Sequence, residues 1–325
     1  MKFVYVLSSS HDDYYYEQAL LSLTSLRLYN PDANIIILID SKTKQNLTNI
    51  RTQYEKLVSE IQVVSPPVEF SQKEASRWIK TSIHKYVKGT FLFIDCDTII
   101  TEKLTQDFSS DIKIGAVLDT HVTLEHHHLK EAFQKEDIKA GFYSSVKSNI
   151  RYNGGLIFCK DDPIGSEFFE KWHSLWIEGR KRNCSQDMPS LNQANHEMGN
   201  IITELSGNWN CQISHNGLPY LHGAKIIHYY ATSLITQTSP FVIASDSVFK
   251  KIKDMGTIPD EVMKLLENPK AAFDSESRIV AGKVALDIVN SNIFAKLLWL
   301  RNKKPHIFDF LNRSSSLVKN SKHKK

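Results

Sequence analysis

Short apolar runs alternate with stretches of helical spacing over the first part of the chain. Residues 3–7, 35–39 and 61–64 are mostly apolar and are predicted to form buried strands. Between them, the stretches 14–28 and 47–57 are predicted to be helices. Strands that alternate with helices in this way predict a parallel, doubly wound α/β sheet.

The next apolar run, 91–94, leads directly into Asp95-Cys96-Asp97, and apolar residues resume after Thr98. A helix predicted over 71–86 precedes it. Because side chains alternate along a strand, Asp95 and Asp97 are expected on one face at its carboxyl end, where open α/β sheets bind ligands. Two adjacent carboxylates repel each other, and Mg²⁺ or Mn²⁺ between them would relieve the repulsion. On this motif alone, two acids that merely cap turns remain an alternative.

Further strands are predicted over 114–118, 152–159 and 224–230. Helices are predicted over 166–177, 259–266 and 277–300, and another is opened by the segment 185–192, where Asp187 is a candidate N-cap. The strand 152–159 is entered through Asn153-Gly154-Gly155, and paired glycines either allow close approach of a ligand or mark a bulge. The polar segment 120–151 has no assigned element and is expected to be a lid or binding loop. Its three consecutive histidines, 126–128, are expected to be solvated. No glycine-rich phosphate-binding loop follows any predicted strand.

Together, these stretches resemble glycosyltransferase family 8 and its GT-A-fold relatives over roughly residues 1–232. The elements that carry the resemblance are, in the family's own order, Arg77 on a helix, Asp95-Cys96-Asp97, Asn153-Gly154-Gly155, Gln186-Asp187 with Leu191-Asn192, Trp209-Asn210, and Ile226-Ile227-His228-Tyr229. After the histidine, however, the family continues with Gly and then Lys-Pro-Trp, whereas this chain continues Tyr230-Ala231-Thr232-Ser233. The resemblance implies a GT-A-type doubly wound mixed sheet flanked by helices, followed here by a helical C-terminal extension.

The resemblance also implies a set of site residues. A divalent metal, Mn²⁺ or Mg²⁺, would be bound by Asp95, Asp97 and His228. The nucleotide-sugar donor would contact Ser8, Ser9, Arg77, Cys96, Asn153, Gly154 and Gly155. On the sugar side, Asp119, Gln186 and Asp187 are the candidate catalytic residues, and Asp187 or Gln186 would be nearest to act as a nucleophile.

The function implied is metal-dependent transfer of a hexose, with retention, from a nucleotide-diphosphate sugar to a glycan or glycolipid acceptor. A uridine diphosphate sugar is the expected donor, and polysaccharide biosynthesis is the expected context. One alternative is a haloacid-dehalogenase-like phosphatase, but that class has Thr or Val where Ile99 stands, and its motif follows the first strand. A second alternative is a non-catalytic nucleotide-sugar binder, which would have no need of the metal-binding trio.

Composition adds information mainly about the end of the chain. The 325 residues carry a net charge of +4, with 41% hydrophobic and 23% charged residues, which is ordinary for a globular protein. From Lys296 onward the chain has nine basic residues and one acid, Asp309. The apolar stretch 293–300 precedes several of these cations, which is typical of an interfacial membrane segment. A small helical subdomain with a basic end is the alternative.

The expected organisation is a catalytic domain over 1–235 and an extension over 236–325. The four cysteines show no Cys-x-x-Cys spacing and are expected to be reduced thiols. No secretory signal or run of about 18 apolar residues is evident. A cytoplasmic location is therefore expected, with an anionic membrane surface as a candidate partner through the tail and no nucleic-acid partner.

Overall fold

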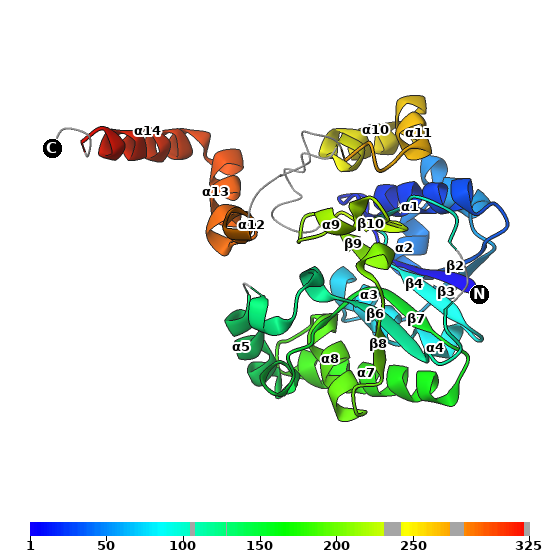
Figure 1. Ribbon diagram of the computed structural model, residues 1–325. Coiled ribbons are helices and arrows are strands. Elements are labelled where there is room, and N and C mark those ends of the chain that lie inside the picture. The colour runs from blue at the N-terminus through cyan, green and yellow to red at the C-terminus, as the bar shows by residue number, and fades with distance from the viewer. Residues whose placement is uncertain (105–107, 128, 231–241, 274–282, 322–325) are drawn as a thin grey trace.

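The computed structural model describes residues 1–104, 108–127, 129–230, 242–273 and 283–321. A central sheet carries helices on both of its faces (Figure 1). Its seven strands lie in the order β3-β2-β1-β4-β7-β6-β8. Strand β7 is antiparallel to both of its neighbours, whereas the other pairs are parallel. The predicted α/β class and doubly wound mixed sheet are thereby confirmed.

The strands of this sheet are β1 (Lys2–Leu7), β2 (Asn34–Asp40), β3 (Glu60–Val64), β4 (Phe91–Ile94), β6 (Ile114–Leu118), β7 (Tyr152–Cys159) and β8 (Ile202–Glu204). A second sheet has the order β5-β10-β9, formed by β5 (Thr98–Ile100), β10 (Ile226–His228) and β9 (Cys211–Gln212). Its first strand, β5, begins shortly after β4 ends. The small sheet therefore lies at the edge where the parallel strands of the large sheet end.

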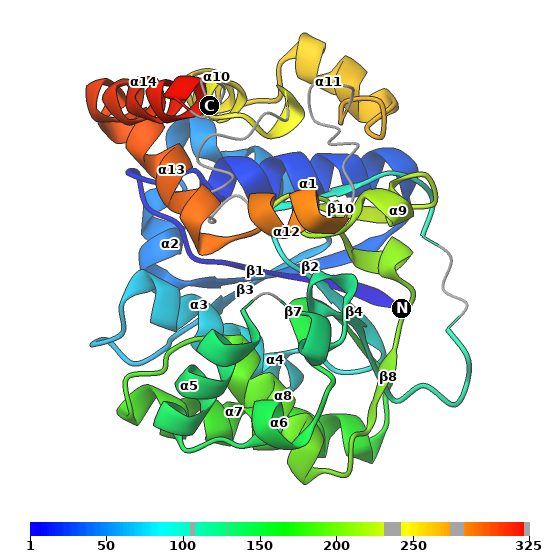
Figure 2. The ribbon, with the colours of Figure 1, turned by 60° about the vertical axis from the view of Figure 1, so that its left-hand side comes forward.

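Alternation along β1 divides the core into two layers. Tyr5 packs in a cluster with α1 (Tyr15–Tyr29), α10 (Asp246–Met255) and α11 (Asp260–Glu267). Val4 and Val6 face a second cluster, to which α3 (Gln72–Thr81), α4 (Ile83–Tyr86), α7 (Pro163–Lys181) and α8 (Asp187–Glu197) contribute. Figure 2 shows α1 on one side of the sheet and α7 and α8 on the other. Burial of both faces explains why the strands read as continuous apolar runs.

Three predicted elements are broken in the structure, one of them the helix 277–300, which is split between α12 (Lys283–Val289) and α13 (Asn292–Lys303). The strand predicted to carry Asp95 and Asp97 at its carboxyl end stops earlier. Strand β4 ends at Ile94, and the chain bends through Asp95, Cys96 and Asp97 before β5 begins in the other sheet. The helix predicted over 71–86 is interrupted at Ser82, which separates α3 from α4. A capping box between Ser71 and Glu74 begins α3, and two reciprocal hydrogen bonds satisfy its first amides.

Other segments also differ from their predictions. The predicted helix over 47–57 is a 3₁₀ segment, η1 (Asn49–Lys56), preceded by α2 (Ser41–Asn46), and Asn49 begins it with a left-handed φ of 56°. The segment 120–151 is not a structureless loop. It contains η2 (Asp119–His121), η3 (Leu124–His126), α5 (Lys130–Ala140) and α6 (Ser144–Lys147). The remaining short elements are η4 (Gly207–Asn210), α9 (Leu218–Leu221) and η6 (Val242–Ala244).

The predicted C-terminal extension, 236–325, is helical where it is described. Its first helices, α10 and α11, pack in the core cluster with α1. Its last three, α12 (Lys283–Val289), α13 (Asn292–Lys303) and α14 (Pro305–Ser321), project from the rest of the molecule in Figure 1. No helix among the described residues is both long and apolar enough to cross a membrane. The predicted domain boundary at 235/236, the start of the predicted helix 277–300, His128, the continuation 231–233 and residues 322–325 lie outside the described residues.

Candidate active site

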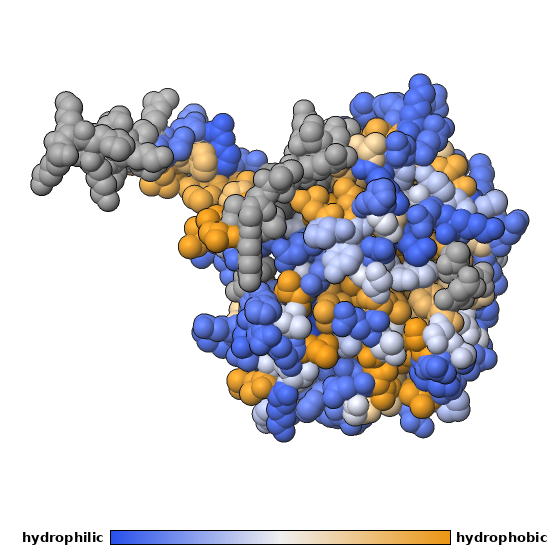
Figure 3. Space-filling view, viewed as in Figure 1, coloured by the Kyte–Doolittle hydropathy of each residue, from blue (hydrophilic) through white to orange (hydrophobic). Residues whose placement is uncertain are grey.

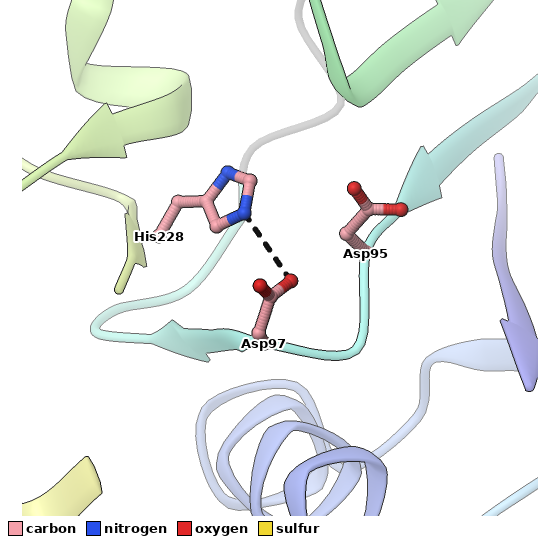
Figure 4. A group of neighbouring side chains, drawn as sticks. All are labelled: Asp95, Asp97 and His228. Carbon is pink, nitrogen blue, oxygen red and sulfur yellow. Dashed lines mark ion pairs between the residues drawn. The ribbon is translucent and has the colours of Figure 1, made fainter. Parts of the chain in front are cut away.

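Three potential metal ligands meet at the bend between β4 and β5. Asp95 and Asp97 lie on the bend itself, and His228 reaches them from the end of β10, which is paired with β5 (Figure 4). One ligand atom from each of the three residues lies within 4.8 Å of the others. His228 Nε2 is 3.2 Å from Asp97 Oδ1. The predicted trio is therefore assembled by a bend and a strand pair rather than by alternation along one strand.

The electrostatics of this trio fit a cation. Burial raises the pKa of Asp95, and nearby Asp97 adds to the rise. For Asp97, burial alone would raise the pKa, but His228 lowers it below its ordinary value. Burial would lower the pKa of His228, yet Asp97 raises it above the ordinary value. Two carboxylates and one imidazole suit Mn²⁺ or Mg²⁺ and would leave coordination positions for phosphate oxygens and water.

Close packing at Gly155 is required for this arrangement. A Cβ on Gly155 would overlap His228 Cε1 and lie only 2.7 Å from its Nδ1. Gly154 faces the opposite end of the site, where a Cβ would lie 3.1 Å from Asp187 Oδ2. The two glycines let strand β7 pass between the metal ligands and Asp187.

The trio opens into a cleft of about 380 Å³. Lys80 links the trio to Asp187: it donates a hydrogen bond to Asp95 Oδ1 (3.2 Å) and lies 2.8 Å from Asp187 Oδ2. Arg77 donates to Gln186 Oε1 at 2.7 Å, and its Nε is 3.7 Å from Asp187 Oδ1. Burial would raise the pKa of Asp187, but Lys80 and then Arg77 lower it. Asp187 is thus held ionised beside two cations.

No family model matches the chain, and no match is found among curated proteins. Among solved structures, the chain is similar to galactosyltransferase LgtC in complex with donor and acceptor sugar analogues, with a TM-score of 0.51 and 14% identity over 81% of this chain and 99% of that one. An active-site variant of LgtC gives a TM-score of 0.53 and 14% identity, with coverage of 80% and 98%. The chain has the GT-A fold. Mouse xyloside xylosyltransferase 1 in its apo form gives a TM-score of 0.45 and 14% identity, with coverage of 70% and 96%.

Within this GT-A fold, most of the predicted site residues line the one cleft. They are Ser8, Arg77, Asp95, Cys96, Asp97, Asn153, Gly154, Gly155, Gln186, Asp187 and His228. The buried hydroxyl of Ser8 has no hydrogen-bond partner among the described residues, so it is available to a ligand. Cys96 donates weakly to the carbonyl of Val6 and fills the bend.

Two predicted residues do not reach the cleft wall. The Ser9 hydroxyl donates to Asp13, and its backbone amide donates to Thr43, so it braces the loop after β1 from the outer side. Asp119 lies behind Asn153, whose amide donates to it at 3.1 Å. Burial would raise the pKa of Asp119, but a hydrogen bond from His127 and the charge of Arg151 lower it.

Three residues of the site were missed from the sequence. Lys80 lies one helical turn after Arg77, and this spacing was the available signal. Asn210 lies in the Trp209-Asn210 pair but had no assigned role, although its side chain is 3.0 Å from His228 Nδ1. Tyr230 has a left-handed φ of 53° and stacks on His228 with ring centroids 4.0 Å apart. A tyrosine in that conformation is strained, which is characteristic of functional sites.

Proposed function

We propose that the protein is a metal-dependent glycosyltransferase that moves a hexose from a nucleotide-diphosphate sugar, with UDP-sugar as the first candidate, to a glycan or glycolipid. The observation that carries this proposal is the division of one cleft into two ends. Asp95, Asp97 and His228 form a cation site at one end, and Asp187 and Gln186 lie with Lys80 and Arg77 at the other. The GT-A fold favours this chemistry, but a fold alone does not establish a function.

The two ends suit the two halves of a nucleotide sugar. A divalent ion held by Asp95, Asp97 and His228 would neutralise the leaving diphosphate as a Lewis acid. Ser8, at the end of β1, would hydrogen-bond the nucleoside, since ligands of open α/β sheets contact these strand ends. Asp187 stays ionised at the sugar end and would stabilise positive charge that develops at the anomeric carbon. With Gln186 beside it, the arrangement is compatible with retention.

The test is hydrolysis or transfer of UDP-hexoses by purified protein, followed with and without Mn²⁺. EDTA should abolish turnover and Mn²⁺ should restore it. Full turnover in a metal-stripped sample would contradict the proposal. Thermal stabilisation by a panel of nucleotide sugars with Mn²⁺ would identify the donor, because ligand binding to the folded state raises the melting temperature. Hydrolysis of an aryl phosphate without sugar transfer would favour the phosphatase alternative.

We also propose that the extension binds an anionic membrane surface. Helix α13 has no buried residue, although it carries Ile293, Leu297 and Trp299, which are 72%, 41% and 42% exposed. The next helix, α14, exposes further apolar side chains, Ile307, Phe310 and Leu311. Figure 3 shows apolar surface on the described part of this extension. The described cations beside it are Lys296, Arg301, Lys303 and Lys304.

Apolar side chains next to cations are what a helix lying in a bilayer interface requires. Each cation near an anionic leaflet contributes about 1 kcal/mol. Such placement on the cytoplasmic side would bring the cleft to a lipid-linked or membrane-displayed acceptor. None of the four cysteines forms a disulfide, which is consistent with that compartment.

Flotation with liposomes rich in phosphatidylserine tests this second proposal. The full chain should float at low salt, and Leu297→Asp should reduce flotation. Val146→Asp is the matched control, since Val146 is an exposed apolar residue of α6 on the catalytic body. Equal flotation of the full chain and of a chain that ends at Asn292 would show that the tail is not the anchor.

A further inference from the structure

We infer that Asn210 is a positioning residue that fixes the tautomer of His228, so that Nε2 presents its lone pair to the metal site. The inference rests on the proposed metal role of His228. It follows from a chain of buried hydrogen bonds that begins at a backbone amide and ends at the imidazole. Asn153, Asn210 and His228 are 2%, 0% and 3% exposed, so water does not compete for these bonds.

The first step fixes the orientation of the Asn153 amide. The backbone N–H of Gly155 points at one atom of that amide, at a distance of 2.8 Å. A backbone N–H can only donate, so this atom is the acceptor, Oδ1. At the other end of the same amide, Nδ2 donates to Asp119 Oδ1 at 3.1 Å, and an ionised carboxylate can only accept. The contacts with Gly155 and with Asp119 therefore require the same orientation of the Asn153 side-chain amide.

The second step transfers this orientation to Asn210. Its amide contacts Asn153 Oδ1 at 2.9 Å, which requires the Asn210 nitrogen on that side. The Asn210 oxygen then faces His228 Nδ1 at 3.0 Å. Because an amide oxygen can only accept, Nδ1 must carry the proton. Nε2 lies 3.2 Å from the Asp97 carboxylate, which can also only accept, so a metal ion would displace a proton from Nε2 while Nδ1 keeps its own proton.

The same network changes the role of Asn153. Its Oδ1 accepts from Gly155 and Asn210, and its Nδ2 donates to Asp119 and also lies 2.9 Å from the Tyr230 hydroxyl. All four hydrogen-bonding positions of the amide are thus used within the protein. The side chain of Asn153 thus supports the metal ligand, while its contact with the donor stays a prediction.

The direct test is the ¹⁵N–¹H long-range correlation spectrum of ¹⁵N-histidine-labelled protein saturated with diamagnetic Mg²⁺, which would take the place of the proton that Asp97 otherwise draws to Nε2. The His228 signals are assigned by their absence in His228→Gln. The wild-type ring should show the proton on Nδ1. A wild-type spectrum with the proton on Nε2 in the presence of Mg²⁺ would overturn the inference, and this measurement needs no donor.

Variants then connect the tautomer to metal binding. Asn210→Leu removes the acceptor and should give a mixture of tautomers with a Mn²⁺ dissociation constant raised about 10- to 100-fold, the usual effect of losing a residue that orients a metal ligand. Asn210→Asp keeps an acceptor and should retain the Nδ1 proton and bind Mn²⁺ more tightly than Asn210→Leu. Asn195→Leu is the control, because Asn195 is also buried and, among the described residues, its side chain accepts a hydrogen bond from the amide of Ile202 on β8, away from the cleft.

A purely structural role would instead weaken Mn²⁺ binding alike in Asn210→Leu, Asn210→Asp and Asn195→Leu. An unchanged tautomer and unchanged Mn²⁺ affinity in Asn210→Leu would also refute the inference. If wild-type protein binds Mn²⁺ and shows the expected tautomer but transfers no sugar, the proposed function fails while this inference stands.

Discussion

Replacement of Lys80 by methionine tests how the cleft balances its charges. The ammonium group lies between Asp95 and Asp187 at hydrogen-bonding distance, and the side chain is only 9% exposed. Burial alone would lower the pKa of Lys80, but Asp187 and then Asp95 raise it from 10.5 to about 12. Since the folded pKa exceeds the unfolded one, the stabilisation is fully present below pH 10.5 and is lost as the pH rises through about 12. At neutral pH it amounts to about 2 kcal/mol.

We therefore expect Lys80→Met to lower the free energy of unfolding by about 2 kcal/mol at pH 7.5. Metal affinity should change in the opposite direction. The ammonium group of Lys80 repels a cation bound at Asp95, and Lys80→Met removes this repulsion. A repulsion of about 1.4 kcal/mol corresponds to a tenfold change in the Mn²⁺ dissociation constant. A loss of stability combined with a gain in cation affinity is not the result of general damage to the fold.

Urea unfolding of metal-free protein measures the first quantity, and titration with Mn²⁺ measures the second. Lys85→Met is the control, because Lys85 is an exposed lysine of α4 outside the cleft. Weaker Mn²⁺ binding in Lys80→Met, or unchanged stability, would refute the reasoning that Lys80 acts as a fixed cation between the two acids.

Three further predictions concern the site and the core. Asp97→Ala should abolish turnover while the circular dichroism spectrum stays native, and near-native turnover would remove Asp97 from the metal site. Arg77→Lys keeps the charge but loses the planar fork that reaches Gln186, so donor KM should rise or kcat should fall; unchanged kinetics would make Arg77 a surface residue. Burial lowers the pKa of His173 from 6.5 to about 4, so its neutral form stabilises the fold above pH 6.5 and that stability is lost as the pH falls towards 4. As the pH falls from 7 to 5, protonation of this ring in the unfolded state should lower the free energy of unfolding by about 2 kcal/mol. In urea titrations, His173→Gln should show a correspondingly smaller decrease.

The strands were predictable because a strand that is buried on both faces is an uninterrupted apolar run in the sequence. Strands β6 and β7 begin and end where the pattern placed them. The bend at Asp95 was not predictable in this way, because Asp95-Cys96-Asp97 could equally continue the strand, with both acids on one face. What separates β5 from β4 is its antiparallel pairing with β10, a contact from the far end of the fold.

The site was predictable where a motif places its residues next to each other, and less so where it depends on distant contacts. Asp95 and Asp97 are obvious in the sequence, whereas Lys80 looks like any lysine on an amphipathic helix. Its role depends on Asp187, which arrives at the same place from α8. Asn210 is similar, since the sequence does not show that His228 will need an oxygen opposite Nδ1.

The pairing of β10 with β5 also has a consequence for the order of folding. Thr98 is in register with His228, so two metal ligands from distant parts of the chain become neighbours only when these short strands join. Such non-local contacts form late, because the chain between them must first lose its freedom. A nascent chain that has not yet reached β10 has both aspartates but lacks His228. In refolding experiments, the recovery of Mn²⁺ binding should therefore lag behind the burial of Trp172 and Trp176 on the other face of the sheet.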